Sequence, residues 1–464
     1  MKENFTDRIS HVLILVAFCL AGIASIIAPI LALSWSRHLF PGFVVEQTLV
    51  VANYGGSGWP GHLAGITFPQ RVTQLDDLPV ITSDDFNATI DSLPPGSNLQ
   101  VRAILPDGTT QTYSTSLLAR FPMRDLIRLF WLPYSIGLAY LAIGIWVYRI
   151  KGPGRSCRAF AFISASVALV TMLFFDLIST HLLPMLWTLA VAVLGSALIS
   201  LSLLFPTEWA FVQNRPWLRL VPYGITLFLA AQSFREIFDN TSPWNYINSW
   251  RASYIYAALG IVFFLVTMIL RLRFRYSLMV RRQAQIILVG SFLAFFPQGI
   301  WFVSPMFGFQ MSYDPLVFLP LLLCFPLSIA LALLRYHLWN VDVIIRRTLI
   351  YSVLSLLLVI VYFSSVVLIQ GLFEAISGQK STIAIVLSTL AIAALSNPLR
   401  IRVQDFIDRR FYRRKYNAEQ ALAQFAATAR DEVDMDKLIT ALLEVVEETV
   451  QPEKLTLLIQ KETQ

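Results

Sequence analysis

The chain has 464 residues, of which 56% are hydrophobic and 14% are charged. Soluble domains contain about 45–50% apolar and about 25% charged residues, so a soluble single-domain protein is excluded. The formal net charge of +7 is better explained by Lys and Arg in cytoplasmic loops than by nucleic-acid binding. The composition therefore predicts a mainly α-helical protein that crosses a membrane several times.

About ten segments are candidates for membrane spans, because a span needs about 20 mostly apolar residues. The first, 12–33, has the basic flank of a signal sequence, but it is long enough to span and has no clear cleavage site. We interpret it as a retained helix. The other spans are expected at 129–148, 159–178, 183–204, 218–234, 252–270, 284–303, 315–334, 348–369 and 382–396.

Basic residues are distributed unevenly between alternate loops. With the N-terminus inside, the short inner segments hold sixteen Lys and Arg, whereas the short outer loops hold three. Cytoplasmic loops are enriched in these residues, so both termini are predicted to be cytoplasmic and 35–125 extracytoplasmic. The segment 218–234 is the weakest span by hydropathy, but without it the basic residues of 271–282 would lie outside.

Five regions follow from these patterns. They are an N-terminal transmembrane helix, an extracytoplasmic domain, a polytopic bundle of about nine spans, a basic juxtamembrane helix and a C-terminal segment, at 1–34, 35–125, 126–397, 398–434 and 435–464. The expected fold is thus a membrane-embedded helical bundle with a small α+β outer domain and a cytoplasmic helical tail.

The outer domain, 35–125, is rich in Gly, Pro, Asp and Thr. Alternating apolar residues over 99–105 predict a strand, and 109–116 would be the return strand of a hairpin. The tripeptide 106–108, Pro-Asp-Gly, predicts the turn between them, because Pro presets φ and Gly accepts positive φ. A short helix is expected over 83–93, with Ser83 or Asp84 as its N-terminal cap.

Parts of this domain resemble the second half of a PDZ domain, namely Ala64-Gly65-Ile66, the run 71–80 and Pro95-Gly96. PDZ domains bind an extended peptide by strand addition and hold its carboxylate in a backbone nest. The counterpart of their Gly-Leu-Gly-Phe loop would be 40–43, and the resemblance makes Gly42, Phe43 and Val44 ligand-binding candidates. Because Pro41 has no N–H, a PDZ-like scaffold for another ligand or for packing on the membrane is favoured over peptide-end binding.

Three polar residues of the apolar runs are further ligand-binding candidates: Asp176, His181 and Gln298. A charged Asp at mid-bilayer costs about 2.5–3.5 kcal/mol, but Asp176 is expected near the outer end of its span. There it could reach water, Ser179 or His181, and contact with a ligand or ion is the alternative. Gln298 follows Pro297, whose bend frees backbone groups, and packing between helices is the favoured interpretation.

Motifs for catalysis are absent from the sequence. It contains no His-Glu-x-x-His, no Gly-x-Ser-x-Gly and no phosphate-binding Gly-x-x-x-x-Gly-Lys-Ser/Thr. No His follows His337, so a histidine-kinase phosphoacceptor is missing, and Cys19, Cys157 and Cys324 form no disulfide or metal-binding pattern. We therefore expect no enzymatic activity, no metal and no cofactor.

Seven basic residues lie within 397–416, directly after the last predicted span and in the first part of the juxtamembrane helix 398–434. Each could add about 1 kcal/mol of attraction to anionic membrane lipids. Anchoring of the helix is the favoured interpretation, and a role in signalling is the alternative. The five that lie closest together are Arg409, Arg410, Arg413, Arg414 and Lys415.

The stretches 335–348 and 397–416 resemble a group of bacterial polytopic sensor proteins. In that group a PDZ-like outer domain and a bundle like that of the competence-pheromone sensor kinase precede cytoplasmic signalling modules. The resemblance places the chain in a bacterial plasma membrane. It also makes 435–464 look like the opening helix and strand of a GAF domain, which would be a vestige, a truncation or a docking helix.

The sequence thus predicts a sensor or receptor module of a bacterial signal-transduction system without its own catalytic domain. A peptide or hydrophobic ligand would bias the outer domain and bundle between two arrangements. A cytoplasmic histidine kinase or a second copy of the chain would read the change. The alternatives are a transporter or lipid-handling carrier whose path passes Asp176, and a non-catalytic scaffold that uses the PDZ-like domain.

Overall fold

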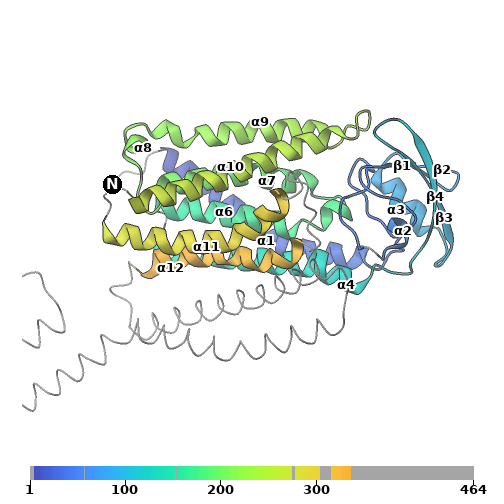
Figure 1. The fold of residues 1–464 in the computed structure, drawn as a ribbon, viewed down its shortest axis with the longest axis horizontal. Helices are drawn as coiled ribbons and strands as arrows, with labels where there is room; N and C mark the ends of the chain where they lie inside the picture. Colours follow the sequence, from blue (N-terminus) through green and yellow to red (C-terminus); the bar gives the residue numbers. More distant parts are fainter. Residues whose placement is uncertain (1–4, 57, 153, 274–276, 304–314, 336–464) are drawn as a thin grey trace, which may run out of the picture. The chain divides into compact units, whose positions relative to one another are not determined.

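The computed structural model describes residues 5–56, 58–152, 154–273, 277–303 and 315–335 (Figure 1). All of them belong to the first of two compact units of the chain, residues 1–371. They form a helical bundle and a small domain with an antiparallel sheet, which we call the sheet domain (36–122). The second unit, 372–464, lies outside the described residues, as do the predictions made for it.

The bundle consists of long helices joined by short helical turns. Its long helices are α1 (Phe5–Trp35), α5 (Leu132–Lys151), α6 (Arg155–Met172), α7 (Pro184–Leu204), α9 (Val221–Glu236), α10 (Asn245–Arg273), α11 (Leu278–Val303) and α12 (Cys324–Arg335). The shorter helical elements are α4 (Met123–Leu126), η1 (Ile127–Trp131), η2 (Asp176–Ile178), α8 (Ala210–Asn214), η3 (Pro216–Arg219) and η5 (Pro315–Leu323).

Seven helices of the described residues are long and apolar enough to cross a membrane. They coincide with seven of the expected spans and support a multi-pass membrane protein. The expected span 218–234 is not among them, since α9 has 16 residues, and it stays a prediction. The expected spans 348–369 and 382–396 lie outside the described residues, so the number ten stays a prediction.

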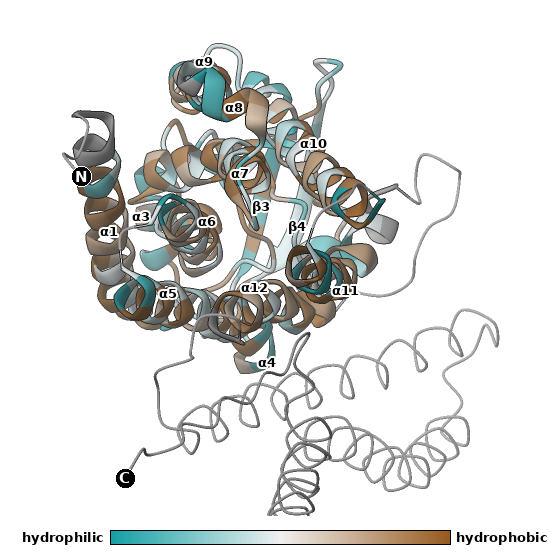
Figure 2. Ribbon diagram, turned by 90° about the vertical axis from the view of Figure 1, so that its left-hand side faces the viewer, coloured by the Kyte–Doolittle hydropathy of each residue, from teal (hydrophilic) through white to brown (hydrophobic). Residues whose placement is uncertain are grey.

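Small residues let the inner helices pack closely. Figure 2 shows α6 surrounded by α1, α5 and α7, and most residues of α6 and α7 are buried. At the crossing of α7 and α10, a Cβ on Gly260 would lie 2.9 Å from the carbonyl oxygen of Gly195. Without side chains there, the two backbones approach more closely than Ala would allow, as at many membrane helix interfaces.

The sheet has the strand order β2-β1-β3-β4, with β1 at Arg71–Leu75, β2 at Leu78–Pro79, β3 at Asn98–Ile104 and β4 at Thr110–Ser116. The predicted hairpin is confirmed, since β3 pairs with β4 and Gly108 in the turn has φ +84°. In β3 the apolar residues Leu99, Val101 and Ala103 are buried and the polar residues between them are exposed, because successive side chains of a strand point to opposite faces.

Two helices complete the sheet domain, α2 (Pro60–Leu63) and α3 (Ser83–Asp91). The predicted cap of α3 is wrong by one residue. Thr82 is the N-cap: its hydroxyl accepts a hydrogen bond from the Asp85 N–H at 3.2 Å, and the Asp85 carboxylate accepts one from the Thr82 N–H at 2.9 Å. This capping box satisfies two N–H groups at once, which Ser83 or Asp84 could not do from inside the first turn.

We expect Gly260→Ala to destabilise the bundle by about 1–3 kcal/mol, because the added methyl group would force α7 and α10 apart. The measurement is thermal unfolding of the protein in lipid nanodiscs. Gly224→Ala on α9 is the matched control, since a Cβ there meets no atom within 4 Å. Equal melting temperatures for the two variants would contradict the close crossing.

Candidate functional site

The contact between the sheet domain and the bundle is built around one hairpin, residues 43–52, which we call the junction hairpin. Its two arms are joined by hydrogen bonds from the Ala52 N–H to the Val44 carbonyl at 2.9 Å and from the Glu46 N–H to the Val50 carbonyl at 2.8 Å. Leu49 completes the reversal with φ +65°. Its carbonyl accepts a hydrogen bond from the Val72 N–H at 3.0 Å, so the hairpin is fixed to β1.

Side chains of the junction hairpin point alternately into two cores, as the period of extended backbone dictates. Those in the sheet-domain core are Phe43, Val45, Leu49 and Val51. Those in the core that includes the bundle helices are Val44, Val50 and Ala52. The sheet domain and the bundle therefore share one structural element and do not merely touch.

An aromatic cluster extends this shared core. The Phe40 ring lies 4.8 Å from that of Trp59 and 4.9 Å from that of Phe121, between ring centroids. Phe121 in turn contacts Trp35 at the end of α1 and Phe175 after α6, at 5.4 and 5.7 Å. Such edge-to-face and tilted aromatic pairs add about 0.5–1.5 kcal/mol each beyond their burial. They therefore stabilise the contact between the sheet domain and the bundle.

The loop between α6 and α7, residues 176–183, is the bundle's side of the contact, and we call it the junction loop. Asp176 organises it: its carboxylate accepts hydrogen bonds from the N–H groups of Leu182 at 3.1 Å and Leu183 at 2.8 Å, and from the Thr180 hydroxyl. Asp176 is only 4% exposed. The expectation that it reaches water, Ser179 or His181 through its side chain is thus replaced by a loop-stabilising role, because neighbouring backbone donors already satisfy its carboxylate.

His181 connects the junction loop to the junction hairpin. It has φ +54°, and its Nε2 donates a hydrogen bond to the Val45 carbonyl at 2.9 Å. Burial lowers the pKa of His181, opposed by that carbonyl and by the Asp176 charge. The imidazole is therefore neutral near pH 7, with the proton on Nε2. It lines a small cleft between the hairpin and α3, together with Phe43 and Phe86.

The structure brings together four of the predicted ligand-binding residues: Phe43, Val44, Asp176 and His181. Gly42 has a backbone role, since it has φ +80° and its missing side chain makes room for Pro60 and Gly61. Gln298 lies on α11, which does not form the junction. The basic candidates Arg409 to Lys415 lie outside the described residues.

Glu46 was not predicted, and it is the most unusual residue of the junction. It occupies a bundle-facing position of the hairpin and is 7% exposed, and its Oε2 is buried without a hydrogen-bond partner in the described part of the chain. Burial raises the pKa of Glu46 from 4.5 to about 7, although a hydrogen bond from the Tyr246 hydroxyl lowers this pKa in part. The sequence feature that could have pointed to Glu46 is its position, as an acidic residue within the mostly apolar run 43–52.

The connection between α9 and α10 holds the same hairpin from another side. The Thr48 hydroxyl donates a hydrogen bond to the Pro243 carbonyl at 3.0 Å, and the Trp244 indole N–H donates one to the Pro69 carbonyl at 2.8 Å. Arg71 fixes the turn of the hairpin through its Nε, which lies 3.1 Å from the Thr48 carbonyl. Two loops of the bundle, the α6–α7 loop and the α9–α10 connection, thus form hydrogen bonds with the sheet domain.

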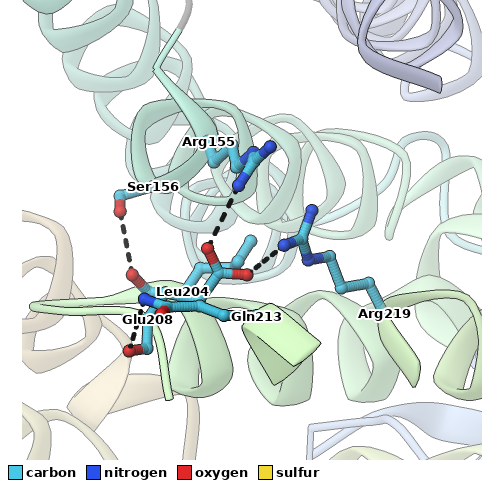
Figure 3. Close-up of polar contacts among 6 residues, drawn as sticks. All are labelled: Arg155, Ser156, Leu204, Glu208, Gln213 and Arg219. Atoms are coloured by element: carbon cyan, nitrogen blue, oxygen red, sulfur yellow. Dashed lines mark hydrogen bonds and ion pairs between the residues drawn. The ribbon is translucent and has the colours of Figure 1, made fainter. Parts of the chain in front are cut away.

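At the other end of α6 and α7 lies an ion-pair group, which we call the Arg–Glu cluster: Arg155, Glu208 and Arg219 (Figure 3). Glu208 accepts a hydrogen bond from Arg155 Nη1 at 3.2 Å and another from Arg219. The fully buried Arg271 donates to the Thr207 hydroxyl at 2.9 Å and to the Ser202 carbonyl at 3.0 Å. These contacts tie α6, α7, η3 and α10 to the segment between α7 and α8.

The chain matches no known protein-family model and no curated protein. Within the described ranges there is no group of three or more His, Cys, Asp or Glu side chains that could hold a metal ion.

Replacing His181 by Ala should loosen the junction hairpin by about 1–3 kcal/mol, because the buried Val45 carbonyl would lose its donor. His181→Gln keeps an N–H donor and is the control. Amide hydrogen exchange of residues 43–52 measures the effect. In Glu46→Gln, which removes the opposing titration of that buried carboxyl, protection is expected to fall on acidification below pH 6.5, since a buried neutral His stabilises above its ordinary pKa and loses that contribution as it protonates. Equal exchange in the Ala and Gln variants would contradict the contact.

A double-mutant cycle of Glu208→Gln and Arg219→Gln should give a coupling energy of about 1 kcal/mol, because the two side chains are 13% and 23% exposed and only partly screened. The same cycle with Arg155, which is 46% exposed, should give a smaller value. Thermal unfolding in nanodiscs provides both numbers. A larger coupling for Arg155 would contradict the assigned order.

Proposed function

We propose that the chain is a sensor or receptor module of a bacterial signal-transduction system, without a catalytic domain of its own. One observation supports this most: the junction hairpin belongs to the cores of both the sheet domain and the bundle. Any ligand that shifts the sheet domain must therefore also shift the ends of α6, α7 and α10. The resting state would be the docked arrangement described above.

The sheet domain is proposed to be PDZ-like and extracytoplasmic. Its cleft lies between the hairpin and α3, where a PDZ domain would take an extended peptide. Here His181 already occupies the Val45 carbonyl, and both residues line that cleft. A peptide or hydrophobic ligand that enters the cleft would compete with the junction loop and so favour an undocked arrangement.

The signal is proposed to reach the other end of the bundle through whole helices. The helices α6 and α7 meet the junction loop at one end and the Arg–Glu cluster at the other, and α10 contacts both ends. The predicted helix 399–433 would pass the change to a cytoplasmic histidine kinase or a second copy of the chain. Membrane lipids are the further expected partner.

A transporter or lipid-handling carrier is the less favoured alternative. It needs polar groups that are free to bind a solute, whereas the Asp176 carboxylate already accepts hydrogen bonds from Thr180, Leu182 and Leu183. A non-catalytic scaffold is also less favoured. It needs no coupling between an outer domain and the membrane helices, whereas here the two share a core.

The test uses undocking by mutation as the stimulus. Single cysteines placed along 399–433 in a chain with its own cysteines replaced are crosslinked in nanodiscs, with and without Trp244→Phe, which removes the hydrogen bond to Pro69. We expect the crosslinking pattern to change. Trp217→Phe, at a side chain that is 59% exposed, should leave it unchanged.

Two results would overturn the sensor proposal. One is an unchanged pattern in Trp244→Phe when amide exchange shows that the junction has loosened. The other is accumulation of a solute in proteoliposomes without any change at 399–433, which would favour the carrier. The first result separates coupling from docking, and the second separates the two classes of function.

A further inference from the structure

Glu46 lies at a position where the junction itself requires an apolar residue. In the alternation of the junction hairpin it shares the bundle-facing side with Val44, Val50 and Ala52. It is 7% exposed, and its Oε2 has no hydrogen-bond partner among the described residues. Burying an ionised carboxylate of which one oxygen has no hydrogen-bond partner costs far more than burying an apolar side chain. Packing alone therefore does not account for a glutamate there.

The groups that face Glu46 do not neutralise its charge. From α10 these are the phenols of Tyr246 and Tyr254, and from the segment after the hairpin the phenol of Tyr54. The pKa of Tyr54 is raised to about 12 by burial and by the Glu46 charge, so this group stays neutral. Two basic side chains contact the hairpin: Arg71 donates a hydrogen bond to the Thr48 carbonyl, and His181 donates one to the Val45 carbonyl. Asp176 on the junction loop is held by its own loop.

From this placement we infer that Glu46 is a proton-binding site of the junction, and that the proton is a ligand which stabilises the docked arrangement. The inference rests on the proposed sensor function and names one stimulus for it, extracytoplasmic acidity. A protonated carboxyl is neutral and can donate a hydrogen bond to an oxygen such as that of Tyr246. An ionised one can be accommodated by water once the sheet domain leaves α10.

The sign of the effect follows from linkage. Burial raises the pKa of Glu46 to about 7 from 4.5, so the docked form takes up a proton more readily than the undocked form. Docking is therefore strongest at acidic pH and weakens as the pH rises from about 4.5 to about 7. Protonation of His181 below pH 6.5 weakens docking, because the buried form of this side chain is the neutral one. In the wild type the two effects partly cancel, and the response of Glu46 must be measured with His181 replaced.

The docking experiment uses the full chain in nanodiscs, with Cys19→Ser and spin labels at Asp77→Cys and Asn240→Cys. Both positions are exposed, one on the sheet domain and one between α9 and α10. In His181→Gln, the docking constant from the distance distribution should rise roughly 30-fold between pH 8.5 and pH 5.5, as a single group with these two pKa values requires. Adding Glu46→Gln should abolish the pH dependence and hold the distance at its docked value.

A direct measurement of protonation accompanies it. Infrared difference spectra of otherwise wild-type protein should show a protonated carboxyl band that titrates near pH 7 and is missing in Glu46→Gln. Glu236→Gln, at a carboxylate that accepts hydrogen bonds from Gln232 and Ser249, should keep that band. Loss of the band in Glu46→Gln alone supports the assignment even if a spin label perturbs docking.

The inference is overturned if no such band titrates, if Glu46→Gln keeps the pH response, or if the distances change with sodium chloride and not with pH. The last result would make the site one for a metal cation. None of these results bears on the crosslinking at 399–433. Conversely, a proton-dependent junction with an unchanging pattern at 399–433 would overturn the sensor proposal and leave the proton site standing.

Discussion

The alternation of side chains along residues 43–52 is the constraint on which the rest of the structure depends. One face of this hairpin completes the sheet-domain core and the other completes the core of the bundle. A hairpin cannot rotate one face without the other, because adjacent side chains are fixed on opposite sides of the backbone. The relative placement of the two parts is therefore set by backbone geometry and not by surface contacts that could slide.

Two buried carboxylates at this junction have opposite environments. Asp176 accepts hydrogen bonds from two backbone N–H groups and a hydroxyl, which shape the loop that contains His181. Glu46 faces phenols and apolar side chains, and burial moves its pKa to about 7. The first carboxylate is structural, while the second is held in a state that a small change in solvent pH can alter.

In the proposed sensor, the helices between the junction and the Arg–Glu cluster would provide the mechanical link. Small residues such as Gly195 and Gly260 let α7 and α10 pack backbone to backbone, and dense packing transmits displacement rather than absorbing it. At one end of these helices lie two buried hydrogen bonds, one accepted by the Val45 carbonyl and one by the Pro243 carbonyl. At the other end lie ion pairs that water partly screens. Changes at the junction are accordingly expected to cost more free energy than changes at the cluster.

The sequence by itself determined the features that have a local period. Apolar runs predicted seven helices that could span a membrane, and the alternation over 99–105 with its Pro-Asp-Gly turn predicted β3 and β4. The cap of α3 was misplaced by one residue, because composition does not fix where a helix begins. The span 218–234 stays a prediction, since α9 has 16 residues. Phe43 and Val44 were singled out separately from Asp176 and His181, without any sign that the two pairs meet.

Only the tertiary structure decided the junction. His181 lies 136 residues from Val45 along the chain, and Thr48 lies 195 residues from Pro243. No period in the sequence reports such a contact, since it arises from how helices pack and which loops they bring together. The burial of Glu46 is a consequence of that packing: the same glutamate in an exposed hairpin would be an ordinary charged residue.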